Sequence, residues 1–344
     1  MRPLGYHRPA DVASAVALLA AHPQARALAG GTNLVDLMKL GVERPALLVD
    51  IARLPLDRIE ETADGGLRIG ATVRNSDLAA HPLVRDRYPL LSGAVLAGAS
   101  GQLRNAATTG GNLLQRTRCL YFQDVTKPCN KRLPGSGCPA LDGVHRDLAV
   151  LGTSAHCVAS HPSDLAVALV ALDAVVHLTG PDGDRVLPLT AFHRLPGDTP
   201  DRDTELAPAE LITAVELPAP PAGATGGYRK VRERASFAFA TVSLAVLLTV
   251  RHDRVAGVRL AFGGLAPKPW RALTAEAALA GGPATEEAFA RAMDAELTTA
   301  RPLRDNAFKV PLAHRLAVTE LTALAVQAAT SAPSAPTDEV QEDR

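Results

Sequence analysis

Three of the four cysteines in this 344-residue chain lie in one short stretch, and the fourth follows soon after it. Residues 116–138 read RTRCLYFQDVTKPCNKRLPGSGC, and the full set, spaced C-x9-C-x8-C-x18-C, is Cys119, Cys129, Cys138 and Cys157. Zinc fingers pair their ligands as C-x2–4-C and ferredoxins use C-x2-C runs, and neither pattern occurs here. Four widely spaced thiolates on a long loop suit a [4Fe–4S] cluster or an all-cysteine zinc site.

The residues around these cysteines favour the iron–sulfur centre. Four thiolates on such a cluster give a net charge of about −2, which nearby cations would offset. The cations of the stretch are Arg116, Arg118, Lys127, Lys131 and Arg132. Glycines 135 and 137, with three prolines, give a backbone that can bend around a cube.

Other interpretations of the cysteines stay open. Cys157 lies in the apolar run LGTSAHCVAS, where a buried core thiol is common, and the other three cysteines would then be incidental. Structural zinc is a second alternative, although the ligand spacing is poor for it. Three histidines are near enough to replace a thiolate ligand, but a lone histidine in a loop is more often a surface or satisfied core residue. They are His145, His156 and His161.

Two Gly-Gly turns, about eighty residues apart, form a second group of candidates. The first, LAGGTNL, follows an apolar strand and comprises Leu28, Ala29, Gly30, Gly31, Thr32, Asn33 and Leu34. The second, within NAATTGGNLL, comprises Thr108, Thr109, Gly110, Gly111 and Asn112. Paired glycines let the backbone approach a ligand, and Thr and Asn add donors, which suits a pyrophosphate. Either turn alone is more often a simple tight turn. Neither fits a Rossmann fingerprint or a P-loop.

Composition and charge exclude several classes of protein. The chain is 47% hydrophobic and 21% charged, as in globular proteins, and its 36 basic and 36 acidic residues cancel. No overall field therefore favours nucleic acid or an anionic membrane. No apolar run approaches the about 20 residues of a transmembrane helix. With no signal peptide expected, a reducing compartment and thiolate chemistry are favoured over disulfides.

The sequence predicts alternating helices and strands, and these elements must position the cysteines and the Gly-Gly turns. We expect a helix at 11–22, strands at 25–31 and 46–52, a hairpin around 64–66, and helical segments broken by Pro82 and Pro89. Residues 116–148 show no sustained period and are predicted to form a long irregular loop. A helix and strand follow at 161–180, and another strand at 210–218.

The C-terminal part is predicted to form a smaller α+β unit. Residues 218–227, PAPPAGATGG, are the best candidate for a linker. Two strands, an Ala-rich helix near 273–280 and helices near 285–300 and 311–329 follow. The tail 331–344 is rich in Ser, Pro, Asp and Glu and is expected to be disordered.

At this point the sequence resembles the FAD-binding medium subunits of the molybdenum hydroxylases, the xanthine and carbon monoxide dehydrogenase group. The resemblance covers residues 3–325 and rests on five ordered motifs, AGGTNL, RNAATTGGN, SHPSDLAVAL, LITAVELP and YRKVRERASFAFATVSLAV. It implies an α/β (α+β) fold: a two-part FAD-binding domain of the vanillyl-alcohol-oxidase (PCMH) type at 1–222, with the cysteine-rich insertion at 116–157, and a small α+β domain at 226–330.

The resemblance also implies roles for single residues. The two turns would hold the phosphates of FAD, Asp164 would be an acidic FAD contact, and Ile212 would offer a backbone contact to the isoalloxazine. Lys230 would lie near the flavin, where a cation stabilises the anion formed on reduction. From the residues alone, Asp164 suits a helix N-cap equally well, and Lys230 suits a solvated charge at a strand end.

The cysteine-rich insertion, with PCNKRLPGSGCPAL, resembles that of periplasmic aldehyde oxidoreductases, whose FAD subunit also holds a [4Fe–4S] cluster. The expected function is therefore electron transfer from a [2Fe–2S] small subunit, next to a molybdopterin-binding large subunit, to an external acceptor, without catalytic residues on this chain. The alternatives are a free-standing flavin oxidoreductase and a zinc-stabilised scaffold subunit. We expect no nucleic acid or membrane partner, and a cytoplasmic location, or a periplasmic one if a partner with a twin-arginine signal exports the assembly.

Overall fold

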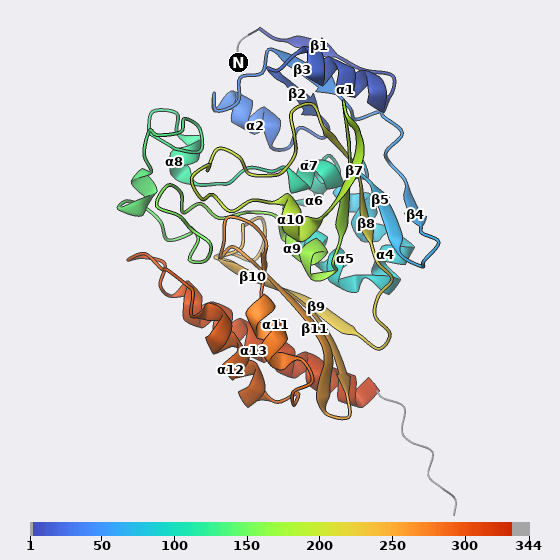
Figure 1. The fold of residues 1–344 in the computed structure, drawn as a ribbon, viewed down its shortest axis with the longest axis vertical. Helices are drawn as coiled ribbons and strands as arrows, with labels where there is room; N and C mark the ends of the chain where they lie inside the picture. Colours follow the sequence, from blue (N-terminus) through green and yellow to red (C-terminus); the bar gives the residue numbers. More distant parts are fainter. Residues whose placement is uncertain (1–2, 332–344) are drawn as a thin grey trace, which may run out of the picture.

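The computed structural model describes residues 3–331, which are arranged as three sheet-centred units along one long axis (Figure 1). The first unit is a parallel sheet of order β1-β3-β2 with two helices. Its elements are β1 (Gly5–His7), α1 (Val12–Ala21), β2 (Ala25–Leu28), α2 (Leu34–Lys39) and β3 (Leu47–Asp50). The predicted cap of the first helix is confirmed, because the Asp11 side chain accepts a hydrogen bond from the backbone N–H of Ser14 at 2.7 Å.

The middle unit is an antiparallel five-stranded sheet of order β4-β5-β8-β6-β7. Its strands are β4 (Ile59–Glu61), β5 (Leu67–Gly70), β6 (Val175–Gly180), β7 (Gly183–Pro188) and β8 (Leu211–Leu217). Leu67 and Ile69 are fully buried while Arg68 between them is exposed, which is the alternation of a sheet with one covered face. The predicted hairpin around residues 64–66 is the β4–β5 pair.

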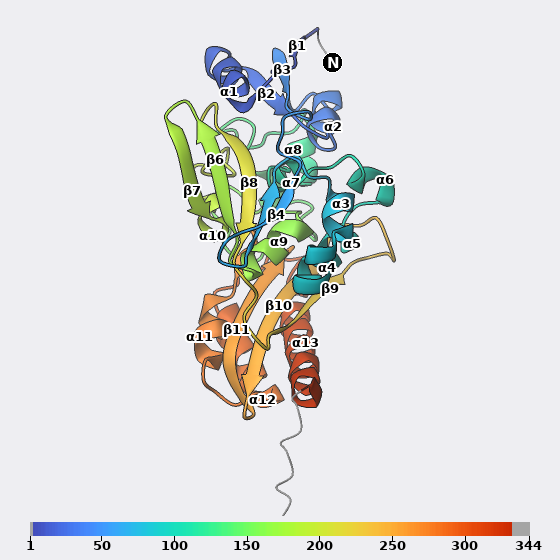
Figure 2. The ribbon, with the colours of Figure 1, turned by 90° about the vertical axis from the view of Figure 1, so that its right-hand side faces the viewer.

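Seven short helices of the described residues belong to this unit (Figure 2). They are α3 (Asn75–Ala80), α4 (Pro82–Arg87), α5 (Pro89–Ala97), α6 (Gly101–Arg104), α7 (Thr109–Leu113), α9 (Asp164–Ala171) and α10 (Leu189–Phe192). Among them, α7 and α10 contact the sheet directly. Pro82 and Pro89 divide the helical segments as the sequence predicts, because each begins a new helix, α4 or α5, and one residue separates it from the end of the previous helix. A proline is well tolerated at the first helical position because its missing N–H has no partner there anyway.

The predicted irregular stretch forms a separate lobe beside the middle unit, drawn in green in Figure 1. Its regular structure is limited to α8 (Leu120–Gln123) and the short 3-10 helix η1 (Pro139–Leu141). A small core of its own holds it together, with Cys119, Phe122, Ala140 and Cys157 buried in it. Arg132 adds three hydrogen bonds, to the carbonyl oxygens of residues 121 and 122 at 2.5 and 2.6 Å and to that of Lys127.

The C-terminal unit contains an antiparallel sheet of order β12-β11-β10-β9 (Figure 2). Its elements are β9 (Thr225–Val231), β10 (Val242–Arg251), β11 (Arg254–Gly263), β12 (Trp270–Arg271), α11 (Leu273–Leu279), α12 (Glu286–Leu297) and α13 (Lys309–Ser331). One face of the sheet shares a core with the three helices of this unit, and the other packs against α5 and α9 of the middle unit. The expected linker 218–227 is shorter than predicted, because β9 begins at Thr225 and pairs with β10.

A buried joint connects the end of the lobe to the C-terminal unit. Lys309 is fully buried and donates hydrogen bonds to the carbonyl oxygens of Leu148 and Gly264 at 3.0 and 2.9 Å. Asn306, also fully buried, donates to the carbonyl oxygens of His145 and Ala149. Residues 145–151 are therefore fixed against the start of α13.

Within the described residues, no helix combines the length and apolar character needed to cross a membrane. Of the tail predicted to be disordered, residues 332–344 lie outside the part of the chain that the structure describes.

Candidate functional site

The two Gly-Gly turns lie back to back, with their backbones in contact. A Cβ atom on Gly30 would lie 1.9 Å from the carbonyl oxygen of Ala106, so only glycine allows this approach. Gly31 has a φ of +71°, in the left-handed region that favours glycine. The turns that sequence reasoning paired therefore form one continuous surface.

The two turns differ in the backbone groups that they offer. In the second turn, the N–H groups of Thr109 and Gly110 donate to the carbonyl oxygens of residues 73 and 71, both at 2.9 Å, and that of Asn112 donates to Thr108. In the first turn, the N–H groups of residues 30–34 have no acceptor among the described residues. The first turn can thus donate hydrogen bonds to an anion. The second turn leaves room for a ligand at its glycines and offers the polar side chains of its Thr and Asn residues.

Two cavities meet at these turns. The first, of about 480 Å³, lies between the N-terminal and middle units. The second, of about 660 Å³, lies between the middle and C-terminal units. Thr32, Asn33 and Gly111 line both. A ligand that lies across the turns can therefore extend into both cavities.

The predicted cofactor residues divide between the two cavities. The first cavity is lined by residues 28–34 together with Thr108, Gly110, Gly111 and Ile212. The second is lined by Asn112, Asp164 and Lys230, in addition to the three shared residues. Ile212 therefore does not lie with Lys230. Thr109 lines neither cavity: it is fully buried, and its hydroxyl group donates to the carbonyl oxygen of Val73 at 3.1 Å.

Asp164 and Lys230 form a buried ion pair in the second cavity. The Lys230 ammonium lies 2.7 Å from Asp164 Oδ2, with the two side chains 3% and 8% exposed. The Tyr228 hydroxyl donates to Asp164 Oδ1 at 2.5 Å. Burial raises the pKa of Asp164, against the opposing effects of Lys230 and Tyr228. Burial, and then Asp164, raise the pKa of Tyr228 well above its ordinary value, so the hydroxyl keeps its proton.

The N-cap of α9 is Ser163, whose hydroxyl accepts from the N–H of Ala166, so Asp164 is the first helical residue and not the cap. The Lys230 side chain is buried and not solvated. The sequence-based alternatives, a helix N-cap for Asp164 and a solvated strand-end charge for Lys230, are therefore wrong.

The second cavity also contains polar atoms without a partner. Asn75 Oδ1 and His161 Nε2 are buried and have no hydrogen-bond partner among the described residues, and both residues line this cavity. Burial lowers the pKa of His161 well below its ordinary value, and lowers that of the adjacent His193 to about 4. Both rings are therefore neutral near pH 7. Free N–H groups, orphaned polar atoms and the glycine clearance fit a bound dinucleotide.

The four cysteines line a third cavity, inside the lobe. All four are free thiols, and burial raises the pKa values of Cys119, to about 11, and of Cys138 and Cys157. Within residues 3–331, no three His, Cys, Asp or Glu side chains are close enough together to bind a single metal ion. The free volume between the thiols is about 10 Å³, so the loop would move outward to admit a larger centre. Gly135 and Gly137, both with positive φ and open space around them, are placed to allow it.

Only one of the three candidate histidines lines this cavity. His156 does so, with its side chain half exposed. His145 is buried with both ring nitrogens engaged, by the carbonyl oxygen of Ala140 and the N–H of Asp305. His161 faces the second cavity.

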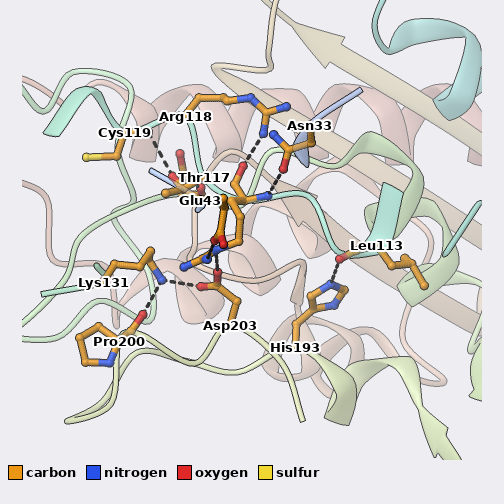
Figure 3. A network of polar contacts seen from close by, with 12 residues as sticks. Asn33, Glu43, Leu113, Thr117, Arg118, Cys119, Lys131, His193, Pro200 and Asp203 are labelled. Carbon is orange, nitrogen blue, oxygen red and sulfur yellow. Dashed lines mark hydrogen bonds and ion pairs between the residues drawn. The ribbon is translucent and has the colours of Figure 1, made fainter. Parts of the chain in front are cut away.

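The segment 116–119 runs between all three cavities, a feature that sequence reasoning missed. Arg116 lines the first cavity, Arg118 the second, and Cys119 the third. Thr117 fixes the segment: its hydroxyl donates to the carbonyl oxygen of Ser160 and accepts from the N–H of Cys119. Figure 3 shows Arg118 and Cys119 pointing away from each other on either side of this strand of chain. Two residues adjacent in sequence, Arg118 and Cys119, therefore line the second cavity and the cysteine cavity.

A series of ion pairs also connects the cysteine cavity to the first turn, and the sequence did not predict it (Figure 3). Lys131, which lines the cysteine cavity, lies 2.5 Å from Asp203 Oδ1, and Asp203 Oδ2 lies 2.5 Å from Nε of Arg116. The N–H of Arg116 donates to Asn33 Oδ1 in the first turn at 2.9 Å. Burial alone would raise the pKa of Asp203, but Arg116 and Lys131 outweigh it, and the pKa lies below its ordinary value.

Two cavities that meet at a pair of glycine-rich turns with free N–H groups define a nucleotide-cofactor-binding protein as the class. Comparison with known families gives the cofactor. A model described as the FAD binding domain in molybdopterin dehydrogenase matches residues 2–220, and one described as the CO dehydrogenase flavoprotein C-terminal domain matches residues 227–322. The chain belongs to the family of FAD-binding medium subunits of the xanthine and carbon monoxide dehydrogenases, and the predicted family and mixed α/β fold are confirmed.

Relatives cover nearly the whole chain. It is 52% identical to the aldehyde oxidoreductase FAD-binding subunit PaoB of Escherichia coli K12, over 95% of this chain and all of the relative. It is 29% identical to the carbon monoxide dehydrogenase medium chain of Hydrogenophaga pseudoflava, over 87% of this chain and 88% of the relative. The solved carbon monoxide dehydrogenase of that organism, without the Mo-pyranopterin moiety of its cofactor, aligns with a TM-score of 0.75 over 95% of this chain and 99% of that chain. The protein is thus an FAD-binding subunit of an oxidoreductase of the molybdenum hydroxylase type.

Proposed function

We propose that this chain is the electron-transfer subunit of an aldehyde-oxidising molybdenum hydroxylase and carries a [4Fe–4S] cluster beside its FAD. The observation that carries the proposal is the adjacency of Arg118, which faces the second cavity, and Cys119, which faces the cysteine cavity. A cluster held by Cys119 would therefore lie next, along the chain, to a residue that lines the cavity to which we assign part of the flavin nucleotide. FAD, when bound, allows two-electron and one-electron carriers to exchange electrons.

The convergence of the four cysteines supports a centre with four sulfur ligands. All four line one cavity, although within the described residues no three of them lie close enough to bind a single metal ion as they stand. The spacing of the cysteines, which lacks C-x2–4-C pairs, favours a cluster over zinc. Because the buried thiols have raised pKa values, each must lose a proton when it becomes a ligand.

The two cavities support an orientation for the FAD. The free N–H groups of the first turn suit its diphosphate. We assign the isoalloxazine to the second cavity, where Lys230 supplies the positive charge expected near the flavin. The adenosine then lies in the first cavity, and Ile212 contacts it there in place of the isoalloxazine.

The relatives support the assignment of partners and substrate. PaoB is named as a subunit of an aldehyde oxidoreductase, and other relatives are named as medium chains or medium subunits. We therefore propose a heterotrimer with a molybdopterin-binding large subunit and a [2Fe–2S] small subunit, with an aldehyde as substrate. Location in the cytoplasm, or in the periplasm after export with a partner, stays a prediction that cell fractionation tests.

Visible absorption together with iron and sulfide counts on the anaerobically purified complex tests the proposal. We expect flavin bands, a broad iron–sulfur shoulder, and four irons beyond those of the small subunit. Cys138→Ser should lose these four irons and keep the FAD, while His156→Ala, changed in the same cavity, should keep both. Flavin without the extra irons would support a flavin subunit without a cluster, and zinc at the cysteines would support a structural site; either result overturns the proposal.

A further inference from the structure

Lys131 differs from the other cations near the cysteines. Of the five cations expected to balance a cluster, Lys131 is the one whose side chain lines the cysteine cavity. Its side chain is only 6% exposed. Arg116 and Arg118 line the other two cavities, and Lys127 is exposed at the surface of the lobe. The remaining cation, Arg132, is used to bind carbonyl oxygens of the lobe.

Hydrogen bonds hold the Lys131 ammonium in one position. It donates to the carbonyl oxygen of Pro200 at 2.8 Å and to Asp203 Oδ1 at 2.5 Å. These two residues come from the segment that follows α10, far from the cysteines in sequence. Asp203 is in turn shared with Arg116, which stacks over the ring of Phe122 at 4.8 Å on the wall of the cysteine cavity. A fixed, buried charge interacts with its surroundings much more strongly than a solvated one, because little water screens it.

We propose that Lys131 is the positioning residue that sets the reduction potential of the centre held by the four cysteines, and that Asp203 moderates its effect. The inference rests on the proposed function. Reduction adds one electron to the centre and makes or breaks no bond. A nearby fixed cation stabilises the added negative charge and raises the potential, whereas a nearby carboxylate lowers it. Lys131 contacts the cavity directly, and Asp203 lies one residue further away.

An EPR-monitored redox titration of the whole complex tests this. Lys131→Met should lower the equilibrium constant for one-electron reduction of the cluster tenfold or more, a fall of about 59 mV. Asp203→Asn should shift the potential in the opposite direction, and the double variant should lie between the two. Lys127→Met removes the same charge from an exposed position in the same lobe and should leave the potential unchanged, because solvent and salt screen it.

The outcomes separate this inference from the function on which it rests. A wild-type complex without the extra four irons would remove the proposed cluster and the inference with it. A wild-type complex with the cluster, but with equal potentials in the wild type and the Lys131→Met variant, would overturn the inference alone. If Lys131→Met loses iron, two other variants test the inference. A potential equal to that of the wild type in Lys131→Arg, and a higher potential in Asp203→Asn, would support it. An unchanged potential for Asp203→Asn, at full iron and FAD content, would overturn it.

Discussion

The carbonyl oxygen of Ala106 lies 1.9 Å from the position that a Cβ atom on Gly30 would occupy. This contact is between backbone atoms of two turns, so neither can move aside without displacing the groups that face the nucleotide. We expect Gly30→Ala to cost about 1–3 kcal/mol or more by overpacking and to weaken FAD binding roughly tenfold or more. The FAD content of the purified complex and fluorescence titration with FAD measure the effect.

Gly101→Ala is the matched control, because a Cβ atom there meets no other atom within 4 Å. Gly101 is the first residue of α6, where alanine is well accepted. FAD binding by the Gly30→Ala variant as tight as that by Gly101→Ala would show that the two turns do not form one cradle.

The Asp164–Lys230 pair gives a prediction for stability. Lys230→Met leaves a buried carboxylate with the Tyr228 hydroxyl as its remaining close partner, which should cost about 3–5 kcal/mol in the free energy of unfolding. The Asp164→Asn/Lys230→Met double variant should recover part of this loss, because no uncompensated charge remains. Urea unfolding followed by circular dichroism measures both. Equal stability of Lys230→Met and wild type would mean that the pair opens to solvent.

Lys309 gives a prediction for pH dependence. Burial lowers the pKa of its ammonium from about 10.5 to about 8. Between these two values the unfolded chain binds more protons than the folded chain, so the contribution of Lys309 to stability rises with pH. The full gain is about 3 kcal/mol. The difference in unfolding free energy between wild type and Lys309→Met, measured from pH 7 to 10.5, should therefore grow in favour of the wild type. A difference that stays constant would mean that the ammonium titrates as a solvated group.

The proposed cluster gives a prediction for the thiols. The chain has four cysteines and the structure places none of them in a disulfide. After chelation of iron in denaturant, we expect this chain, separated from its partners, to react with a thiol reagent at four sites. In the native complex with its iron intact, the same assay should count none of the four. Two or more fast-reacting thiols in the iron-loaded complex would show that those cysteines are not ligands.

Local patterns were sufficient to predict much of the fold. The helix capped by Asp11, the hairpin around residues 64–66 and the strand at β8 depend on short-range signals that the sequence displays directly. The same signals missed one strand boundary. The start of β9 is hidden in a glycine-rich stretch because its pairing with β10 supplies the stability that its sequence lacks.

The site was predictable only where its residues belong to one motif. The Gly-Gly turns carry their own signature, whereas the Lys131–Asp203–Arg116 chain joins residues far apart in sequence with no common spacing. The burial of Thr109 and the division of Ile212 and Lys230 between two cavities depend on how the three units pack. No periodicity within a single segment encodes that packing.

The lobe closes tightly over its sulfur atoms and is fastened at its far end by Asn306 and Lys309, which come late in the chain. Ala149 of this joint also donates its N–H to the carbonyl oxygen of Val158, the residue after Cys157. We therefore expect filling of the proposed cluster site and docking of the C-terminal helix to favour each other during maturation.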